Sequence, residues 1–582
     1  MLPLDPRRVP PPADDAPRAR GRRLRLPRPR LSVEALLLLA SLWFLLVANG
    51  RFLALALQGR DAAAASTWGL ALALVVGVFA AHLLLLLPLA SRYTVKPWLS
   101  LMLVVTALAG DAIRRFGVYL DPAMLRNVLR TDWHEASELL SPSMLLSLLV
   151  FAGLPIALLW RVELPRLPLA RTVKRRLALA LAALLMLVLA LLSAYQPLAS
   201  LMRNQRELRY LVTPANALWS LASATLVDAR ARGSARLPIG LDARPGPLRA
   251  AAARPQLLVL VVGETVRSAN WGLAGYARQT TPELARLVGE QPLVDFARVR
   301  ACGTDTETSL PCMFAPVGRR AYDEATIRGS QSLLQVLARA GIGVTWRDNQ
   351  SGCKGVCDGL PTQSTRDLAA TTPGCESGAC LDEVLLQGLP ELLQQVQGTQ
   401  VLVLHMLGNH GPAYFRRHPP AFTRFTPECR DDDLSRCTSA EIVNAYDNAL
   451  LYTDHLLAQL IRTLQDAQSR VDSAIVFVSD HGESLGEANL YLHGLPYLIA
   501  PDVQKEVPML MWFSKGFAAA RTLDLRCLSA RAQQPAAHDH LFHTLLGLLD
   551  VRTALYEPDW DLTGACRSAA GGVAQTAASA AR

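Results

Sequence analysis

The sequence has no cysteine before Cys302, although ten cysteines follow from that point on. No internal repeat is evident. No small-residue cleavage site follows the first apolar run, which is therefore expected to stay in the mature protein. Leu, Ala and Val dominate instead up to about residue 200, and the part after about residue 250 has the composition of a soluble α/β protein. A chain of 582 residues divided in this way predicts a multidomain protein.

Five apolar runs in the first part are each roughly long enough to cross a bilayer, which takes about 20 helical residues. They lie near 32–53, 66–90, 97–113, 143–160 and 177–198. The third run is the weakest, because Asp111, Arg114 and Arg115 interrupt its end. Its alternative is a buried or re-entrant segment. The runs together predict a five-helix transmembrane bundle.

Basic residues gather on one side of these runs. The formal net charge of +10 invites a nucleic-acid partner, but the arginines are concentrated near the spans, so no nucleic acid is expected. Nine arginines lie within residues 1–30, Arg92 and Lys96 flank the second loop, and six more basic residues crowd the fourth. The positive-inside rule therefore places the N-terminus and these two loops in the cytoplasm. Five crossings carry residues 200–582 to the far side of the membrane.

The cysteines support the same sidedness, because they fall into five close or plausible pairs that indicate disulfides and an oxidising compartment. They are Cys302, Cys312, Cys353, Cys357, Cys375, Cys380, Cys429, Cys437, Cys527 and Cys566. A zinc cluster is the alternative for the four residues between Cys353 and Cys380. No suitable His or Cys partners lie near these four in the sequence, so disulfides are favoured.

The part after residue 250 alternates short apolar strands with helical stretches such as 332–340 and 441–466, which predicts an α/β sheet with mostly parallel strands. Polar residues follow three of the predicted strands. Glu264 follows 256–262, His410 follows 401–404, and Asp480-His481 follows 473–478. Because ligands bind beyond the carboxyl ends of such strands, we expect these side chains to converge.

This set of side chains suits a divalent metal, and the nitrogen ligand favours zinc over magnesium. His493 lies twelve residues after His481 and could approach the same place. The loop from Cys302 to Cys312 contains Thr304, Thr306 and Thr308. Zinc lowers the pKa of a coordinated hydroxyl, so a threonine clamped by Cys302–Cys312 could act as a nucleophile. Spacing alone does not say which threonine is used.

Several motifs together closely resemble the bacterial lipid A phosphoethanolamine transferases, a family in the alkaline phosphatase/sulfatase superfamily that includes the mobile colistin-resistance enzymes. The motifs are Val-Val-Gly-Glu264-Thr, Cys302-Gly-Thr-Asp-Thr306-Glu-Thr-Ser-Leu-Pro-Cys312, Trp346-Arg-Asp-Asn, Gly408-Asn-His410-Gly-Pro, Asn444-Ala-Tyr-Asp-Asn and Ser479-Asp480-His481-Gly-Glu. The resemblance extends from the first span to about residue 566. It implies a transmembrane bundle in the bacterial inner membrane with a periplasmic sulfatase-like domain.

The resemblance also implies roles for individual residues. Thr306 is the expected nucleophile, which becomes loaded with phosphoethanolamine. Glu264, Thr306, Asp480 and His481 are the expected ligands of one tightly bound zinc ion. His410 and His493 are expected to bind the phosphoryl group or a second zinc and to assist proton transfer.

Two further segments are expected to bind substrate. Lys354 matches a residue that binds the substrate phosphate. The stretch containing Asn127, Thr131 and Glu135 resembles the segment that contacts the lipid, and on a helix these three share one face. Without the resemblance, an ordinary solvated helix face would be the favoured interpretation. Thr306 lies between Asp305 and Glu307, where many relatives have smaller or uncharged residues, and this leaves the preference for an acceptor open.

The predicted reaction moves phosphoethanolamine from phosphatidylethanolamine to lipid A phosphate, which lowers the negative surface charge and gives resistance to polymyxin and other cationic peptides. The alternative is a superfamily phosphotransferase or phosphodiesterase that acts on a core sugar phosphate or a glucan. A sulfatase is disfavoured, because the loop has no Cys/Ser-x-Pro-x-Arg setting. A non-catalytic membrane sensor would leave the metal-type residues unexplained. The His538-Asp-His540-Leu-Phe-His543 stretch is expected to be structural.

The expected divisions of the chain are a disordered basic cytoplasmic tail at 1–30, a transmembrane domain at 31–198 with a periplasmic loop at about 114–142, an interfacial helix and linker at 199–250, a periplasmic catalytic domain at 251–566, and a disordered tail at 567–582. Within 199–250, residues 201–210 are expected to form an amphipathic helix on the membrane surface.

Overall fold

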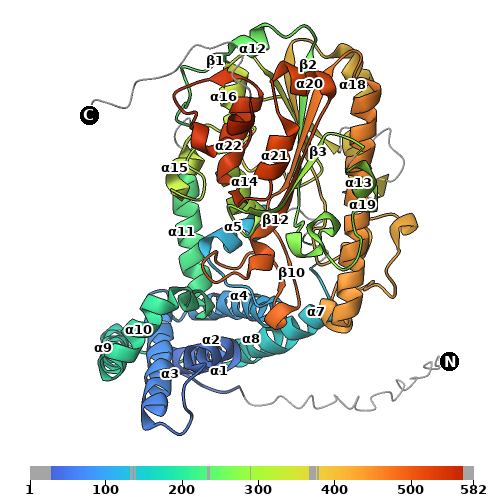
Figure 1. Cartoon of the computed structure of the whole chain (residues 1–582). Helices are drawn as coiled ribbons and strands as arrows, with labels where there is room; N and C mark the ends of the chain where they lie inside the picture. Colours follow the sequence, from blue (N-terminus) through green and yellow to red (C-terminus); the bar gives the residue numbers. More distant parts are fainter. Residues whose placement is uncertain are drawn as a thin grey trace, which may run out of the picture.

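The computed structural model describes residues 28–131, 136, 139–232, 236–288, 290–365, 375–376 and 379–567. The predictions for the two terminal tails fall almost wholly outside this set, and Glu135 also lies outside it. A bundle of helices forms one end of the molecule and a sheet covered by helices forms the other (Figure 1).

The helical bundle contains long apolar helices. It comprises α1 (Val33–Ala48), α2 (Gly50–Leu57), α3 (Ala65–Leu86), α4 (Val95–Phe116), α7 (Pro142–Leu148), the π-helical turn η1 (Leu149–Gly153), α8 (Leu154–Arg161) and α9 (Leu169–Ser193). Among the described residues, α3, the continuous stretch Pro142–Arg161 and α9 are long and apolar enough to span a membrane. The pair α1–α2, bent by 59°, adds a fourth candidate if it forms one span.

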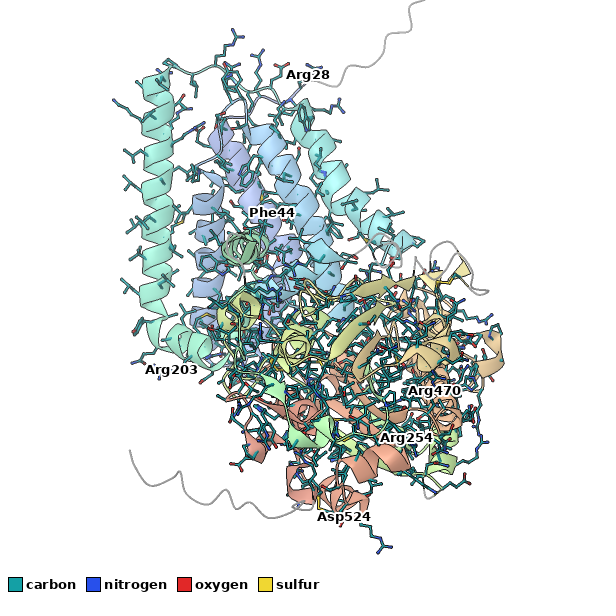
Figure 2. All side chains as sticks on the ribbon, turned by 90° about the horizontal axis from the view of Figure 1, so that it is seen from above. Arg28, Phe44, Arg203, Arg254, Arg470 and Asp524 are labelled. Carbon is teal, nitrogen blue, oxygen red and sulfur yellow. A yellow bond between two sulfur atoms is a disulfide. The ribbon has the colours of Figure 1, made fainter. Side chains whose placement is uncertain are left out.

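The third predicted span corresponds to α4, which has 22 residues but does not meet the same test of length and composition. This helix carries Lys96, Asp111, Arg114 and Arg115, and Asp111 pairs with Arg115 at 2.8 Å. The crossing by α4, and with it the number five, therefore stays a prediction. Figure 2 shows Arg28 at the end of the bundle far from the sheet domain and Arg203 at the near end, as the predicted sidedness requires.

Three segments lie between the bundle and the sheet. They are α5 (Pro122–Arg130), the pair α10 (Tyr195–Asn204) and η2 (Arg206–Leu211), and α11 (Ala215–Arg232). The predicted helix over 201–210 is wrong in its continuity, because the backbone leaves the helical region at Gln205 (φ −136°, ψ 50°). After this break, Leu208 and Leu211 pack in the same apolar cluster as Leu201.

The sheet domain contains an eight-stranded mixed sheet in the order β13-β3-β12-β9-β2-β8-β4-β5. The strands are β2 (Gln256–Gly263), β3 (Leu293–Arg300), β4 (Gly343–Asp348), β5 (Thr362–Ser364), β8 (Thr399–His405), β9 (Asp472–Ser479), β12 (Glu506–Phe513) and β13 (Ala536–Ala537). Among the described strands of this sheet, only β12 runs antiparallel to both of its neighbours. The prediction of a mostly parallel sheet is therefore confirmed.

Helices cover both faces of this sheet (Figure 1). One face packs against α14 (Thr306–Met313), α16 (Leu333–Arg339), α20 (Lys515–Ala520), α21 (Leu525–Arg531) and α22 (Asp539–Leu548). The other packs against α13 (Pro282–Leu287), α18 (Leu389–Gln395) and α19 (Ser439–Asp466). Every residue of β2 is buried, as expected for a central strand covered on both faces.

Smaller elements complete the domain. They are α12 (Pro247–Ala250), α15 (Glu324–Gly329) and three two-stranded pairs, β1 (Arg244–Pro245) with β14 (Val551–Arg552), β6 (Cys375–Glu376) with β7 (Ala379–Cys380), and β10 (Ser484–Leu485) with β11 (Tyr491–Leu492). The bundle and the sheet domain also share an apolar cluster, in which Leu495 and Ala500 of the sheet domain join Leu120 and Leu211. The two parts are therefore packed together rather than joined by a free linker.

All ten cysteines form disulfides, as predicted. The pairs are Cys302–Cys312, Cys353–Cys357, Cys375–Cys380, Cys429–Cys437 and Cys527–Cys566. The alternative of a zinc cluster at the four residues between Cys353 and Cys380 is thereby wrong, because each of their sulfurs is bonded to another sulfur.

Candidate active site

Two adjacent parallel strands place the metal-type residues. Strands β2 and β9 pair in parallel, with Gly263 opposite Ser479. Glu264 follows the first strand directly, and Asp480 and His481 follow the second. The register therefore brings all three to one edge of the sheet, as the sequence predicts.

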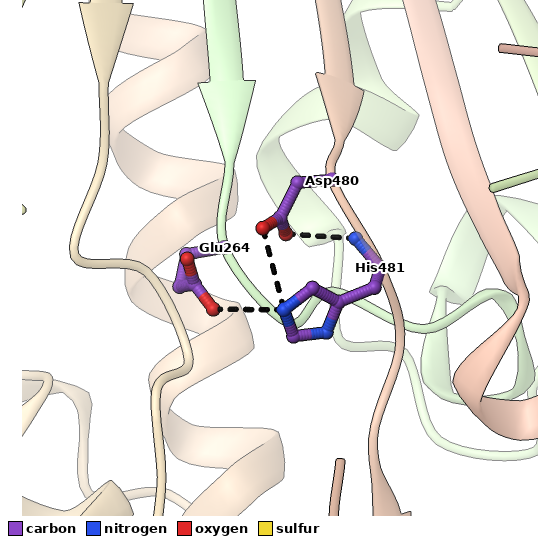
Figure 3. Close-up of side chains that lie close together, drawn as sticks. All are labelled: Glu264, Asp480 and His481. Carbon is purple, nitrogen blue, oxygen red and sulfur yellow. Dashed lines mark hydrogen bonds and ion pairs between the residues drawn. The ribbon is translucent and has the colours of Figure 1, made fainter. Parts of the chain in front are cut away.

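These three side chains meet in a fully buried cluster (Figure 3). The Nε2 atom of His481 lies 3.4 Å from Oε1 of Glu264 and 3.3 Å from Oδ2 of Asp480. One ligand atom from each residue lies within 4.8 Å of the other two. This is the spacing at which one ion can contact all three.

The protonation of His481 makes the cluster fit a cation. Its Nδ1 lies 2.9 Å from the carbonyl oxygen of Gly482, which can only accept, so Nδ1 carries the proton. Burial lowers the pKa of His481 well below its usual value, so the ring is neutral and the Nε2 lone pair faces two carboxylates. Three buried acceptors facing one another are unfavourable without a positive charge between them. Two carboxylates and an imidazole are a donor set that suits zinc.

Thr306 joins this cluster as the first residue of α14. Its Oγ lies 3.1 Å from Oε2 of Glu264 and 3.4 Å from Nε2 of His481. The preceding Asp305 caps the helix by accepting the backbone N–H of Thr308 at 2.8 Å. By contrast, the hydroxyl of Thr304 donates to the carbonyl of Leu495. The geometry thus distinguishes among the threonines of the loop and brings Thr306 to the cluster.

Two histidines stand beside the cluster. The ring of His493 lies 4.4 Å from that of His481 and 5.5 Å from that of His410, measured between centroids. Nδ1 of His493 lies 2.8 Å from Oε2 of Glu483. Burial by itself would lower the pKa of His493, but the Glu483 carboxylate raises it overall. A cationic His493 next to the cluster suits the binding of a phosphoryl group.

The residues expected to bind substrate lie further out. Lys354 donates to Oγ of Ser351 at 2.7 Å, and no described contact joins it to the cluster. Asn127 lies on α5, and Thr131 ends this helix instead of continuing its face. Glu135 lies outside the described residues, so the shared face of the three residues stays a prediction. Both the N–H and the hydroxyl of Thr131 bond to the carbonyl of Asn127, which closes the helix at that point.

Gln350 is a neighbour of the cluster that sequence reasoning missed. It follows the end of β4, and its Nε2 donates to Oε2 of Glu264 at 2.7 Å. Glu264 therefore accepts from both Gln350 and Thr306 through one oxygen. The sequence signals near this position were the Trp346-Arg-Asp-Asn motif and Lys354, and neither points to Gln350 itself.

His538 was expected to be structural, and it lies behind α14. Its Nε2 donates to the carbonyl of Ser479, and its Nδ1 accepts the N–H of Cys302. Ser309 of α14 donates to the carbonyl of Asp480 at 2.5 Å. These bonds tie the threonine loop to the end of β9, so His538 braces the cluster from outside.

Comparisons with known proteins agree with this geometry. Residues 256–551 match the sulfatase family, and residues 78–228 match the family described as phosphoethanolamine transferase EptA/EptB. Phosphoethanolamine transferase EptA of Escherichia coli K12 is 38% identical over 548 residues, which is 93% of this chain and 98% of that protein. Phosphatidylethanolamine transferase Mcr-1 of Escherichia coli is 34% identical over 90% of this chain and 96% of its own.

A solved structure extends the similarity to both parts of the molecule. The integral membrane lipooligosaccharide phosphoethanolamine transferase A from Neisseria meningitidis superposes with a TM-score of 0.87 at 36% identity, covering 93% of this chain and all of that one. The predicted fold class, a membrane domain joined to a sulfatase-like α/β domain, is therefore confirmed.

Proposed function

We propose that this chain, which belongs to the family of bacterial phosphoethanolamine transferases that includes EptA, transfers phosphoethanolamine from phosphatidylethanolamine to a phosphate of lipid A through a covalent intermediate on Thr306. The chain is a membrane transferase with its soluble domain in the periplasm. The observation that carries the proposal is the position of Thr306 Oγ, 3.1 Å from Glu264 and 3.4 Å from His481.

In the first step Thr306 Oγ attacks the phosphorus of phosphatidylethanolamine. The bond from phosphorus to the diacylglycerol oxygen breaks, and phosphoethanolamine stays on the threonine. Glu264 accepts the hydrogen bond of the attacking hydroxyl and is placed to take its proton. His493, whose pKa is raised by the Glu483 carboxylate, is placed to supply the proton that the departing diacylglycerol oxygen needs.

Glu264, Thr306, Asp480 and His481 are the residues that would hold zinc. When bound, zinc lowers the pKa of a hydroxyl and stabilises negative charge on the phosphoryl oxygens. Burial of the cluster excludes water, which strengthens each of these electrostatic interactions. A second zinc would need His410 and His493, which lie side by side next to the first set.

In the second step an oxygen of the lipid A phosphate attacks the phosphorus held by Thr306. The bond from phosphorus to Thr306 Oγ breaks, the threonine regains a proton, and the modified lipid leaves. The transferred ethanolamine carries an ammonium group that offsets a negative charge on the acceptor. Polymyxin and other cationic peptides then bind the bacterial surface less strongly.

The proposal is tested by lipid A mass spectrometry in cells that produce Thr306→Ala at wild-type abundance. The variant has no side-chain oxygen to load, so no phosphoethanolamine-modified lipid A is expected. Incubation of the purified wild-type protein with phosphatidylethanolamine should add one phosphoethanolamine to the peptide containing Thr306. Fully modified lipid A in the Thr306→Ala strain would refute the proposal.

Thr304→Ala is the matched control, since it removes a hydroxyl from the same loop that points to the Leu495 carbonyl instead. It is expected to keep most of the lipid A modification. Omitting lipid A from the purified reaction distinguishes a transferase from a phosphodiesterase, which would release free phosphoethanolamine at an undiminished rate.

A further inference from the structure

An ion-pair network begins at the residue that follows the nucleophile. Glu307 is fully buried in the first turn of α14. Its carboxylate accepts from Nη1 of Arg328 at 2.9 Å, and its carbonyl accepts from Nη2 of the same residue at 2.6 Å. Arg328, in α15, also pairs with Glu324 at 3.0 Å. The catalytic domain therefore pairs both acids with its own arginine.

Helix α5 adds a second cation to each of these acids. Arg130 donates to Oε1 of Glu307, and Arg126 donates to Oε1 of Glu324. Arg126 and Arg130 are four residues apart, so they lie on one face of α5. The side chain of Arg126 is only 2% exposed, and that of Arg130 is 33% exposed. Five alternating charges thus join α5 to the helix that starts with Thr306.

Arg328 and the two arginines of α5 contribute differently to this network. A buried carboxylate needs a paired cation, and Arg328 already provides one to each acid within the catalytic domain. Arg328 carries only one positive charge against the two carboxylates, so Arg126 and Arg130 also help to neutralise Glu307 and Glu324. Their second effect is structural. What they add is a connection between the nucleophile helix and a segment that leads into the bilayer.

The location of α5 gives this connection a consequence. In Figure 1, α5 lies below α14 and above α4, on the side of the catalytic domain that faces the bundle. A pocket of about 380 Å³ is lined by residues from both the start of α5 and the threonine loop. Its lining includes Asp121 and Ala123 from the first segment, and Asp305 and Thr308 from the second. The docking of α5 therefore helps to shape a pocket beside the loop that contains the nucleophile.

We propose that Arg126 and Arg130 are positioning residues that hold α5 on the nucleophile helix, so that a phospholipid donor arriving from the bilayer is aligned with Thr306. This inference rests on the proposed function, because it concerns the loading of Thr306 from a membrane lipid. The two arginines should therefore affect the reaction with a lipid substrate but not the reaction with a small soluble substrate.

The test compares two donors with the same transferred group in the full-length protein in phospholipid nanodiscs. One donor is phosphatidylethanolamine in the disc, and the other is water-soluble 4-nitrophenyl phosphoethanolamine. For Arg130→Gln and Arg126→Gln, kcat/KM for phosphatidylethanolamine is expected to fall about tenfold, equivalent to about 1.4 kcal/mol in the barrier. Release of nitrophenol is expected to stay within about twofold of wild type, because α14 keeps Arg328. Arg130→Lys, which retains the charge, should restore part of the lipid activity.

Arg115→Gln is the matched control, because Arg115 also joins the bundle to the catalytic domain, through Asp433 at 3.7 Å, without contacting α14. It should leave the ratio of the two activities unchanged. Equal losses on both donors, no loss on either, or the same change in ratio for Arg115→Gln would each overturn the proposal. A wild-type protein that loads Thr306 from neither donor would instead refute the proposed function.

Discussion

At the scale of single residues, the site residues that directly follow strands could be predicted from the sequence. The site residues that loops bring to the cluster could not. Glu264, Asp480 and His481 each follow an apolar strand directly, so parallel pairing brings them together. Gln350 reaches Glu264 from a loop after β4, and its sequence neighbours do not determine where that loop turns. Likewise, spacing alone did not separate Thr306 from Thr304, since the difference is which acceptor each hydroxyl meets.

Gln350→Ala tests the importance of that missed contact. Without the amide, Glu264 loses a donor that fixes its carboxylate, and residues supporting a metal ligand typically contribute about 10- to 100-fold to metal affinity or activity. We expect the apparent affinity for zinc to fall by about tenfold. The amount of zinc retained after dialysis against a chelator, measured by elemental mass spectrometry, reports this affinity. Gln363→Ala removes a side chain that bonds Arg347 instead, and it should retain zinc like the wild type. Unchanged zinc retention in Gln350→Ala would contradict this role.

Asp348 predicts a dependence of stability on pH. Burial alone would raise the pKa of Asp348, but His405 and further hydrogen-bond donors lower it to about 2. A lowered pKa means that the carboxylate stabilises the fold above about pH 4 and that this contribution is lost as the pH falls toward 2. Relative to the usual value of 3.8, the shift is worth about 2 kcal/mol.

Asp348→Asn removes this contribution while keeping the size of the side chain. The variant should melt at a lower temperature than the wild type at pH 6, and the difference should narrow as the pH falls below about 4. Thermal unfolding followed by near-ultraviolet circular dichroism measures it. A difference between the two proteins that stays constant from pH 6 to pH 3 would contradict the assignment.

At the scale of elements, the central strands and long helices were predicted well because their apolar residues are numerous. Strand β2 spans Gln256–Gly263 where 256–262 was expected, and α19 spans Ser439–Asp466 where 441–466 was expected. The prediction that was wrong concerns the segment 201–210 near the membrane surface, which is not one continuous helix. Helix α5 ends at Arg130, because Thr131 bonds back to Asn127, and α10 ends at Asn204. Such ends are decided by a few local bonds that apolar periodicity does not report.

The Cys302–Cys312 disulfide closes a segment that contains all but the last residue of α14. Replacing both cysteines with serine is expected to lower the free energy of unfolding by about 3 kcal/mol, from the entropy of a loop of this length. The same change at Cys353 and Cys357, which are 4 residues apart, should have a smaller effect of about 2 kcal/mol. Chemical denaturation of the purified variants measures both. The reverse order would show that strain or packing outweighs loop length.

At the scale of the whole molecule, two unrelated features of the sequence agreed on sidedness, and the similarity to an integral membrane transferase supports the result. Arginine and lysine gather at the cytoplasmic ends of the helices, and the cysteines gather in the opposite part. Composition did not establish the crossing by α4, because its charged residues pair with partners inside the protein. Hydropathy counts Asp111 as exposed to lipid, although it is buried and pairs with Arg115.

The crossing by α4 is tested with single cysteines on its two sides, since all native cysteines in the described residues are disulfide-bonded. Tyr93→Cys precedes α4 and is expected to be protected from a membrane-impermeant maleimide in intact spheroplasts. Leu140→Cys follows α4 and should be labelled, as should Arg60→Cys in the first loop. All three positions are exposed in the structure. Equal labelling of Tyr93→Cys and Leu140→Cys would exclude the crossing.

The order of the disulfides along the chain has a consequence for oxidative folding of the protein. The cysteines are joined in consecutive pairs, the first with the second, the third with the fourth and so on. The partners are between 4 and 39 residues apart. During secretion, an oxidase that links thiols as they emerge into the periplasm would generate the native set directly. Maturation of this chain is therefore expected to require a thiol oxidase but to proceed without a disulfide isomerase.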